Sequence, residues 1–409
     1  MNLPFFIARR YMVMQKGGFS SFIIRLAIIA TALSVAVMIL AIAFITGFKY
    51  TVREKLFTFL GNVHIETYNP NHSESLSLNP IKSDPALVAH VLQTPHVTHV
   101  YPFVQRPAIL QAHGQMEGLF LKGVDKDYVF SPNISFTGNK LNYTDTQYSK
   151  QIILSQSTAA RLNVNTGDSI LLYFLEPGVR VPRIRKVQVT GIFHTGMEEL
   201  DKYYGITDMR LLQRVNNWKP NEISGYQLEL DNEQYSDTVA NGIYERYLTS
   251  PLTTYTIRDI YPNIFDWLDL QNINGQIIII IMALVAIINL ATALMILIME
   301  QARMLGILQA LGMSLKSIQQ IFLYYAGIIA GVGILAGNLF AFLFCWLQVK
   351  FGFLTLSEDT YYMKHVPVRF HLWQIAIIDG GTLILCILCM WLPTLYIRRI
   401  RPARVLQFK

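Results

Sequence analysis

The chain has 409 residues, of which 52% are hydrophobic and only 15% are charged, and its mean hydropathy is +0.33. This composition is too apolar for an ordinary soluble domain of this size, so membrane-spanning segments are expected. The formal net charge is +7, but the polar part of the chain has no basic stripe or aromatic-interleaved patch, which argues against a nucleic-acid-binding protein.

The first apolar stretch runs from Leu26 to Phe48 without a charge. Spanning a hydrocarbon core of ~30 Å takes ~20 helical residues, because every backbone polar group in lipid must bond within the helix. A signal-peptide core has about 7 to 15 apolar residues and ends in a small-residue cleavage site, which this longer run lacks. Residues 26–48 are therefore interpreted as an uncleaved first span, and residues 1–25 as a cytoplasmic amphipathic segment.

An apolar stripe continues past the first span. Its residues recur every four positions, which is the spacing of one helix face: Phe44, Phe48, Val52 and Leu56. Phe265 and Leu268 repeat this spacing before the second span. Two long helices are therefore expected to leave the bilayer and carry movement to the outer domain. Alternatively, the stripes only dock that domain on the membrane.

Residues 49–272 are expected to form one large extracytoplasmic domain of mixed α and β structure. Strand-like runs fall at Val63–Tyr68, Ala108–Gln111, Leu119–Val124, Gln151–Leu154, Ser169–Phe174, Lys186–Phe193 and Gly225–Leu230. Helical patterns fall at Pro85–Gln93, Ser155–Leu162, Asp208–Val215 and Glu233–Leu248. Interspersed strands and helices without a repeat favour one or two packed α+β subdomains.

The rest of the chain contains three further apolar stretches. It divides into a second span, a cytoplasmic loop, a third span, a short external loop, a fourth span and a cytoplasmic tail: residues 273–299, 300–316, 317–349, 350–371, 372–397 and 398–409. The predicted fold class is therefore a membrane protein with four transmembrane α-helices and a large extracytoplasmic mixed α+β domain inserted between spans one and two.

The positive charges give the orientation. The two ends of the chain and the loop of residues 300–316 hold eleven Lys and Arg residues against one acid, Glu300. Lys and Arg near the ends of spans stay on the cytoplasmic side, so these segments are expected inside and the large domain outside.

No catalytic motif is present in the sequence. A phosphate-binding loop, HExxH and GxSxG are all missing. His96 and His99 lack a cluster of further ligands, and Cys386 and Cys389, a CxxC within a span, are interpreted as packing residues. No metal or cofactor is expected, and the chain is not expected to be an enzyme. Any ATP hydrolysis must therefore come from a separate chain.

The cytoplasmic loop contains a short amphipathic helix. Leu305, Leu308 and Leu311 share one face at three-residue spacing. Gly312 is placed to end this helix, and Ser314 to cap the next one. An apolar face on the cytoplasmic surface needs a cover, which is either a nucleotide-binding subunit or the headgroup layer of the membrane.

This stretch resembles the coupling segment of the MacB/FtsX-type permeases, commonly E-x-x-R-E-I-G-I-L-x-A-L-G-A-S. The matching residues are Glu300, Arg303, Gly306, Leu308, Ala310, Leu311, Gly312 and Ser314. The segment from Pro393 to Leu406 is similar to the closing P-x-x-x-A-x-R-x-x-P-x-E-A-L of that family. Met304 and Arg404 depart from these patterns, because each stands where the family usually has an acid.

Three further segments resemble the lipoprotein-releasing LolC/LolE group of this superfamily. Tyr361–Val368 resembles Y-x-L-x-x-[LV]-P-V, and Phe193–Met197 with Asp201 resembles F-x-T-G-M-x-E-x-D. Phe120–Asp125 resembles V-x-[IV]-x-G-[IV]-[DE]. The resemblance covers nearly the whole chain and implies a MacB-like periplasmic domain and a location in a bacterial inner membrane.

The resemblance also implies the function and the partners. Such permeases pair with a second copy or a paralogue and bind a cytoplasmic LolD-like ATPase dimer that uses ATP and Mg. They take acylated lipoproteins from the outer leaflet and pass them to a periplasmic LolA-like chaperone. Force from the ATPase would enter at Glu300, Arg303, Leu305, Gly306, Leu308, Leu311 and Gly312 and drive the long helices together outside. The alternatives are a MacB/FtsX-like permease for peptide or lipid export or hydrolase regulation, and a membrane scaffold without transport.

Two further sites are expected on these grounds. Acyl chains need contiguous apolar surface, so the lipid site is placed on Phe44, Phe48, Val52, Leu56, Phe265 and Leu268; alternatively these residues pack against other spans. The segment Phe174–Arg183 lies where the group has a hook-like hairpin for its chaperone, with Pro177, Gly178, Arg180, Pro182 and Arg183 as docking residues. An ordinary hairpin tip is the alternative. A LolC-like role, a LolE-like role and a homodimer remain open.

Overall fold

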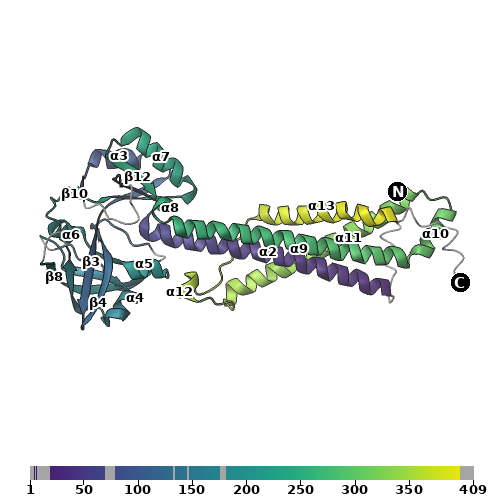
Figure 1. Cartoon of the computed structure of the whole chain (residues 1–409), viewed down its shortest axis with the longest axis horizontal. Helices are drawn as coiled ribbons and strands as arrows, with labels where there is room; N and C mark the ends of the chain where they lie inside the picture. Colours follow the sequence, from purple (N-terminus) through teal and green to yellow (C-terminus); the bar gives the residue numbers. More distant parts are fainter. Residues whose placement is uncertain are drawn as a thin grey trace. The chain divides into compact units, whose positions relative to one another are not determined.

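A computed structural model of the chain describes residues 19–69, 79–131, 134–144, 147–175 and 181–396, together with Pro4 and Phe6 (Figure 1). Only the backbone is described at residues 19, 20, 302, 303, 305, 359 and 389–396. The described chain divides into two compact units. The helical unit contains the residues up to Lys49, Leu268–Thr355 and those from His365 onward, and the α+β unit contains Tyr50–Trp267 and Leu356–Lys364.

Three helices are long and apolar enough to cross a membrane. They are α2 (Phe19–Leu60), α9 (Pro262–Glu300) and α11 (Leu315–Phe351). The fourth predicted span corresponds to α13 (Leu372–Tyr396), in which Leu372–Leu388 is a shorter apolar stretch among the residues searched. The described chain therefore has a helix at each of the four expected positions, and the fourth crossing stays a prediction.

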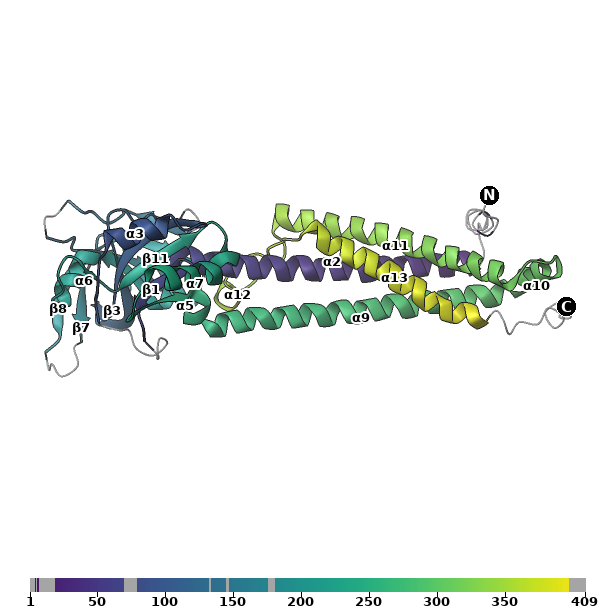
Figure 2. The same ribbon diagram turned by 90° about the horizontal axis from the view of Figure 1, so that it is seen from above.

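The helices of the helical unit share a buried apolar cluster. Ala27 of α2, Leu294 of α9, Phe322 of α11 and Cys386 of α13 all belong to it. α11 and α13 also pack against each other, and both can be followed in Figures 1 and 2. The packing interpretation of Cys386 is consistent with its burial, whereas the side chain of Cys389 lies outside the described residues.

Two glycines bring α11 close to α2. A Cβ atom at Gly333 would lie 2.8 Å from Cβ of Thr31, and one at Gly337 would lie 2.6 Å from the carbonyl oxygen of Ala32. Small residues allow membrane helices to pack at such short distances. A polar contact also joins α11 to α13, where Asn338 Nδ2 donates to Asp379 Oδ2 at 2.8 Å.

The α+β unit is organised around β3 (Val97–Ala112), a strand that serves two parts of one sheet. Its first half pairs with β11 (Gly225–Leu230), which is followed by β1 (Val63–Thr67) and β12 (Leu252–Thr256). Its second half pairs with β4 (Gln115–Val124) on one side and β7 (Ser169–Phe174) on the other.

The second half of β3 belongs to a closed ring of strands. From β4 the pairing passes to β9 (Tyr204–Asp208), β6 (Gln151–Ser155), β8 (Arg183–His194) and then through β7 back to β3. β5 (Ser135–Gly138) extends β8, and β2 (Ile81–Lys82) pairs separately with β10 (Glu222–Ile223). Ring closure removes the exposed strand edges that otherwise favour aggregation.

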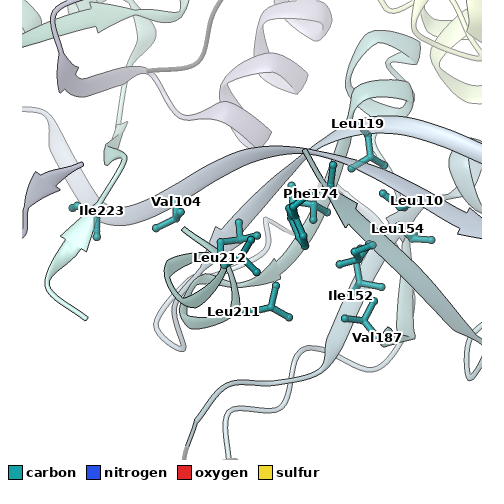
Figure 3. Close-up of a cluster of buried hydrophobic side chains, with 14 of the residues drawn as sticks. Val104, Leu110, Leu119, Ile152, Leu154, Phe174, Val187, Leu211, Leu212 and Ile223 are labelled. Atoms are coloured by element: carbon teal, nitrogen blue, oxygen red, sulfur yellow. The ribbon is translucent and has the colours of Figure 1, made fainter. Parts of the chain in front are cut away.

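Short helices cover the sheet, and their starts follow from local sequence. Three of them begin after a residue whose side chain accepts a hydrogen bond from a backbone N–H of the first helical turn. These capping residues are Asp84 for α3 (Pro85–Leu92), Ser155 for α4 (Gln156–Leu162) and Asp208 for α6 (Met209–Val215). The other helices are α5 (Glu198–Tyr203), η1 (Glu233–Tyr235) with α7 (Ser236–Tyr247), and α8 (Ile257–Ile260). Figure 3 shows Leu211 and Leu212 of α6 gathered with Phe174 and Val187 of the ring strands in the core.

The elements predicted from the sequence are present, with shifted ends. The predicted strands at Ser169–Phe174 and Gly225–Leu230 match β7 and β11, whereas the prediction at Ala108–Gln111 captured only part of the long β3. Sequence patterns missed β9, β12 and α5, which lie in short or polar runs. The external loop is also more ordered than expected, because it contains α12 (Glu358–Tyr361) and a bridge between Thr355 and His365.

Candidate functional site

The last turn of α2 is the point at which two of the sequence motifs meet in the α+β unit. Phe59 stacks on Phe193 of β8 and meets Tyr204 edge-on, each with ring centroids 5.5 Å apart. The carbonyl oxygen of Phe59 accepts a hydrogen bond from Lys122 Nζ on β4 at 2.8 Å. The motifs at 120–125 and 193–201 therefore anchor the end of the extended first helix.

Lys122 is a buried cation, only 4% exposed. Besides Phe59, it donates to Gln227 Oε1 at 2.5 Å, and its ammonium lies 5.2 Å from the ring centroids of Phe59 and Tyr128. Burial lowers the pKa of Lys122 to about 7, although Glu229 opposes this change. A lysine at the C-terminal end of α2 also complements the helix dipole. The motif pattern leaves the position of Lys122 unspecified, so nothing in the sequence indicated its role.

Thr195 and Asp201 hold the turn that follows β8. The backbone N–H and the hydroxyl of Thr195 donate to Asp201 Oδ1 at 3.0 and 2.7 Å, and Asp201 is buried. Gly196 adopts φ +70°, a conformation that favours glycine. A Cβ atom at this position would also lie 2.3 Å from Lys55 Nζ and 2.8 Å from Glu358 Oε1. The glycine of the motif is therefore needed for both its backbone conformation and the close approach of these side chains.

The segment Leu356–Lys364 is bound to this turn by polar contacts within the α+β unit. Lys55 Nζ donates to the carbonyl oxygens of Tyr362 and Gly196 at 2.6 and 3.2 Å. Tyr362 Oη donates to Glu199 Oε1 at 2.6 Å, and the Tyr362 ring meets Trp267 edge-on. Sequence analysis noted the motif at 361–368 but gave no sign that its first residues bind the turn after β8.

The predicted coupling helix is observed as α10 (Ala302–Ala310) in the helical unit. Gly312 follows it with φ +90°, and Ser314 caps α11 by accepting the N–H of Ser317, as predicted. Leu308 packs against the buried cluster shared by α9 and α11, while Leu311 lies just beyond the helix and is 79% exposed.

The remaining predicted coupling residues do not add to the exposed apolar surface of α10 that the structure describes. Gly306 is buried, and Glu300, the last residue of α9, is exposed. The side chains of Arg303 and Leu305 lie outside the described residues. The exposed apolar surface near α10 therefore includes Leu311 and Ile307, which is 47% exposed and was not predicted.

Most of the predicted lipid-contacting stripe is buried. Val52, Leu56 and Leu268 have no exposed surface, and Phe265 is 4% exposed. Phe265 packs against Phe57 with ring centroids 6.1 Å apart. The stripe residues Phe44 and Phe48 are half-buried. Four of the six residues are therefore covered by the protein in this conformation, and lipid contact by the stripe stays a prediction.

The predicted hook is only partly described. Pro177, Gly178 and Arg180 lie outside the described residues, and Pro182 is half-buried. Arg183 begins β8 and donates to the carbonyl oxygen of Val215 and to Asn217 Oδ1, so it is tied to the end of α6. The described part of the hairpin therefore has a fixed base on the ring of strands.

Neither histidine near residue 100 belongs to a metal cluster among the described residues. His96 contacts Asp231 and stacks on Tyr235, and His99 lies 3.6 Å from Glu229.

Long apolar helices joined to a large α+β unit define a membrane protein of the permease class, in which a water-exposed domain is attached to spanning helices. The chain belongs to the family of the MacB-like periplasmic core domain, whose model matches residues 25–243. Residues 276–402 match the FtsX-like permease C-terminal model. The protein is therefore a multi-pass membrane protein with a periplasmic domain and the permease architecture of ABC transporters.

Several relatives are similar along their whole length. The lipoprotein-releasing system transmembrane protein LolC of Xylella fastidiosa (strain 9a5c) is 24% identical over 98% of both chains. The corresponding LolE of Haemophilus influenzae is 25% identical over 99% of both. The periplasmic region of MacB from Actinobacillus actinomycetemcomitans aligns with 50% of this chain and 92% of its own, at 13% identity and a TM-score of 0.35.

Proposed function

We propose that this chain is the permease subunit of an ATP-driven exporter that extracts acylated lipoproteins from the outer leaflet of the bacterial inner membrane and hands them to a periplasmic chaperone. The supporting observation is the end-to-end similarity to relatives named for lipoprotein release. This similarity includes the helices as well as the α+β domain, so the relatives share more with this chain than one common domain.

The proposed topology has four spans with the periplasmic domain between the first two. α13 contains 25 residues, and at a rise of ~1.5 Å per residue it is about 37 Å long, enough for a hydrocarbon core of ~30 Å. The excess of Lys and Arg at the chain ends and in the loop of residues 300–316 supports a cytoplasmic location for those segments.

Energy for transport is proposed to come from a LolD-like ATPase dimer that binds ATP and Mg, because this sequence has no phosphate-binding loop. No cofactor is assigned to the chain itself. Leu308 and Met313 pack against the cluster that contains Leu294 of α9 and Phe322 of α11. A push on α10 would therefore reach the spanning helices directly, with Ile307 and Leu311 available to the ATPase.

Two continuous helices support a mechanical route to the periplasm. α2 has 42 residues and α9 has 39. In the helical unit, Lys49 Nζ bonds to Asn272 Oδ1 at 2.8 Å and lies 3.7 Å from Asp269. Because Val52 and Leu56 are buried, acyl contact by either residue requires α2 to part from the residues that cover it, whereas the half-buried Phe44 and Phe48 need a smaller change.

The remaining partners are a second permease copy or a paralogue and a LolA-like chaperone. The hairpin between β7 and β8 is proposed to dock the chaperone. Arg183, held by Val215 and Asn217, would give that hairpin a rigid base.

The proposal is tested by replacing the exposed apolar residues near α10. Ile307→Asp together with Leu311→Asp should abolish co-purification of the ATPase from mild detergent, while membrane insertion stays normal. Val129→Asp, which changes a 58% exposed residue of the α+β unit outside the sites assigned above, is the matched control and should leave co-purification of the ATPase unchanged.

Depletion of the protein separates the remaining functions. Outer-membrane lipoproteins stranded in the inner membrane would support lipoprotein release. A defect in cell separation alone would favour hydrolase regulation, and absence of any co-purifying ATPase would favour a scaffold.

A further inference from the structure

A cluster of charged side chains joins four elements of the α+β unit. Lys55 comes from α2, His194 from the end of β8, Asp201 from α5 and Glu358 from α12. The proposed function does not use this cluster. Its members are far apart in the sequence, so only the fold brings them together.

His194 bridges two carboxylates. Its Nδ1 lies 2.8 Å from Asp201 Oδ2, and its Nε2 lies 2.8 Å from Glu358 Oε1. Ionised carboxylates only accept hydrogen bonds, and a neutral imidazole has a single N–H. Both contacts at once therefore require one more proton than neutral histidine with two carboxylates can supply.

The surroundings place that proton on the imidazole. Asp201 Oδ1 already accepts two hydrogen bonds from Thr195, so this carboxylate acts as an acceptor on its other side as well. Partial burial opposes ionisation of Glu358, but the hydrogen bond and charge of His194 hold the pKa of Glu358 below its ordinary value. Two ionised carboxylates and a doubly protonated His194 satisfy every donor and acceptor of the bridge.

The other charges near the bridge fit the same assignment. Lys364 Nζ lies 3.5 Å from Glu358 Oε2, and burial lowers the pKa of Lys55 while Glu358 and Asp201 oppose that change. Glu199 accepts the hydroxyl of Tyr362. Glu198 also acts on Tyr362, so four carboxylates stand against two ammonium groups, and a protonated His194 reduces the excess of negative charge.

We propose that His194 is the positioning residue of a proton-dependent latch, in which a doubly protonated imidazole holds the segment Leu356–Lys364 on the turn after β8. This segment lies within the loop of residues 352–371 that joins α11 to α13, and its two ends meet where Leu356 N donates to the carbonyl oxygen of Lys364 at 3.0 Å. Loss of the proton leaves one of the two carboxylates facing a nitrogen lone pair. The latch then weakens, and the segment is held on the turn only by the contacts of Lys55 and Tyr362.

The latch has two limits in pH. Histidine is the side chain that ordinarily changes charge between about pH 5 and pH 8, so a latch that needs a doubly protonated imidazole weakens as the pH rises. At the acid end, protonation of Glu358 removes the second contact, and its lowered pKa keeps the contact until the pH is well into the acid range. In transport, which rests on the proposed function, the latch would decide whether spans three and four move with the periplasmic domain.

Amide hydrogen exchange of the full-length protein in detergent tests the latch without a transport assay, so its outcome is independent of the proposed function. The readout is the protection factor of residues 356–364, corrected for the intrinsic pH dependence of exchange. In the unmodified chain it should fall about tenfold or more when the pH rises from about 6 to about 8.5, since a charge-assisted hydrogen bond is lost.

Two variants and one control complete the experiment. His194→Gln should lower the protection at every pH to about the level that the unmodified chain reaches at about pH 8.5, because the contacts of Lys55 and Tyr362 remain. Glu358→Gln should keep most of the protection and lose its pH dependence, because an amide can donate to neutral His194. His99→Gln changes an exposed histidine 3.6 Å from Glu229 and should behave like the unmodified chain.

Protection that is constant with pH in the unmodified chain would overturn the proposal, as would a His194→Gln protein with normal protection in the segment. Exchange in β6 and β8 reports whether His194→Gln has folded. If it has not, Glu358→Gln decides alone: unchanged pH dependence in that variant rejects the latch, and its loss supports the latch.

Discussion

The two ends of α2 are held by different kinds of contact. In the helical unit the helix packs through small and aliphatic residues, such as Thr31 and Ala32 against the glycines of α11. In the α+β unit its last turns are held by buried or half-buried ammonium groups, Lys122 on Phe59 and Lys55 on Tyr362. Lipid gives no hydrophobic drive for helices to associate, so close packing dominates there, whereas a water-exposed domain can add charged contacts at its border.

This difference separates what each end tolerates. A larger side chain at a glycine of α11 should disrupt the close packing of the helical unit. The polar contacts of Lys122 and Lys55 in the α+β unit should instead respond to pH or to the loss of one hydrogen-bonding group. The following substitutions test the two kinds of contact, from the largest expected effect to the smallest.

Gly337→Leu should be the most damaging change. Its Cβ would lie 2.6 Å from a backbone oxygen of α2, so the helices must separate, at a cost of about 3 kcal/mol or more. The melting temperature in detergent should fall clearly. Gly331→Leu is the matched control, because nothing lies within 4 Å of its added Cβ. Equal melting temperatures for both variants would show that α2 and α11 do not pack here.

Lys122 should make the stability of the α+β unit depend on pH. Its pKa is about 7 in the folded protein, below the ordinary lysine value of 10.5, so unfolding takes up a proton between these pH values and stability rises with pH across that window. Between about pH 7 and pH 9 the gain should be ~2 kcal/mol, read from hydrogen exchange in β4. Lys122→Met should remove this dependence, and Lys126→Met, at an exposed position, should keep it.

Gly196→Ala should destabilise the turn after β8 by about 1 to 2 kcal/mol, because φ is positive and the methyl group meets Lys55 and Glu358. Gly114→Ala isolates the backbone contribution, since Gly114 has φ +79° and open space around its Cβ position. If the melting temperature falls further for Gly196→Ala than for Gly114→Ala, the difference measures the cost of the methyl group's contact with Lys55 and Glu358. Identical shifts would mean that Lys55 moves aside without cost.

Tyr362→Phe should have the smallest effect. It removes one hydrogen bond to Glu199, worth about 0.5 to 1.5 kcal/mol, and leaves the backbone oxygen that Lys55 uses. Hydrogen exchange of residues 356–364 should increase slightly. Tyr361→Phe, at an exposed position, should leave exchange unchanged.

Sequence patterns predicted the structure best where a single physical requirement determines it. The apolar runs identified all the long helices, and the short helix with Gly312 and Ser314 was placed within two residues, because span length and capping are local properties. The four-residue stripe correctly indicated that α2 continues to Leu56 and beyond. It did not indicate whether the stripe faces lipid or another helix, since periodicity defines a face without naming its neighbour.

The sequence by itself determined the membrane class, the long helices and the α+β character of the domain, because composition and periodicity act along the chain. Only the tertiary structure decided that β3 closes a ring of strands, that Lys122 caps α2, and that His194 bridges Asp201 and Glu358. Asp201 and Glu358 are 157 positions apart in the sequence. No local pattern specifies such a contact, because it arises from strand pairing that places the end of β8 beside a distant loop.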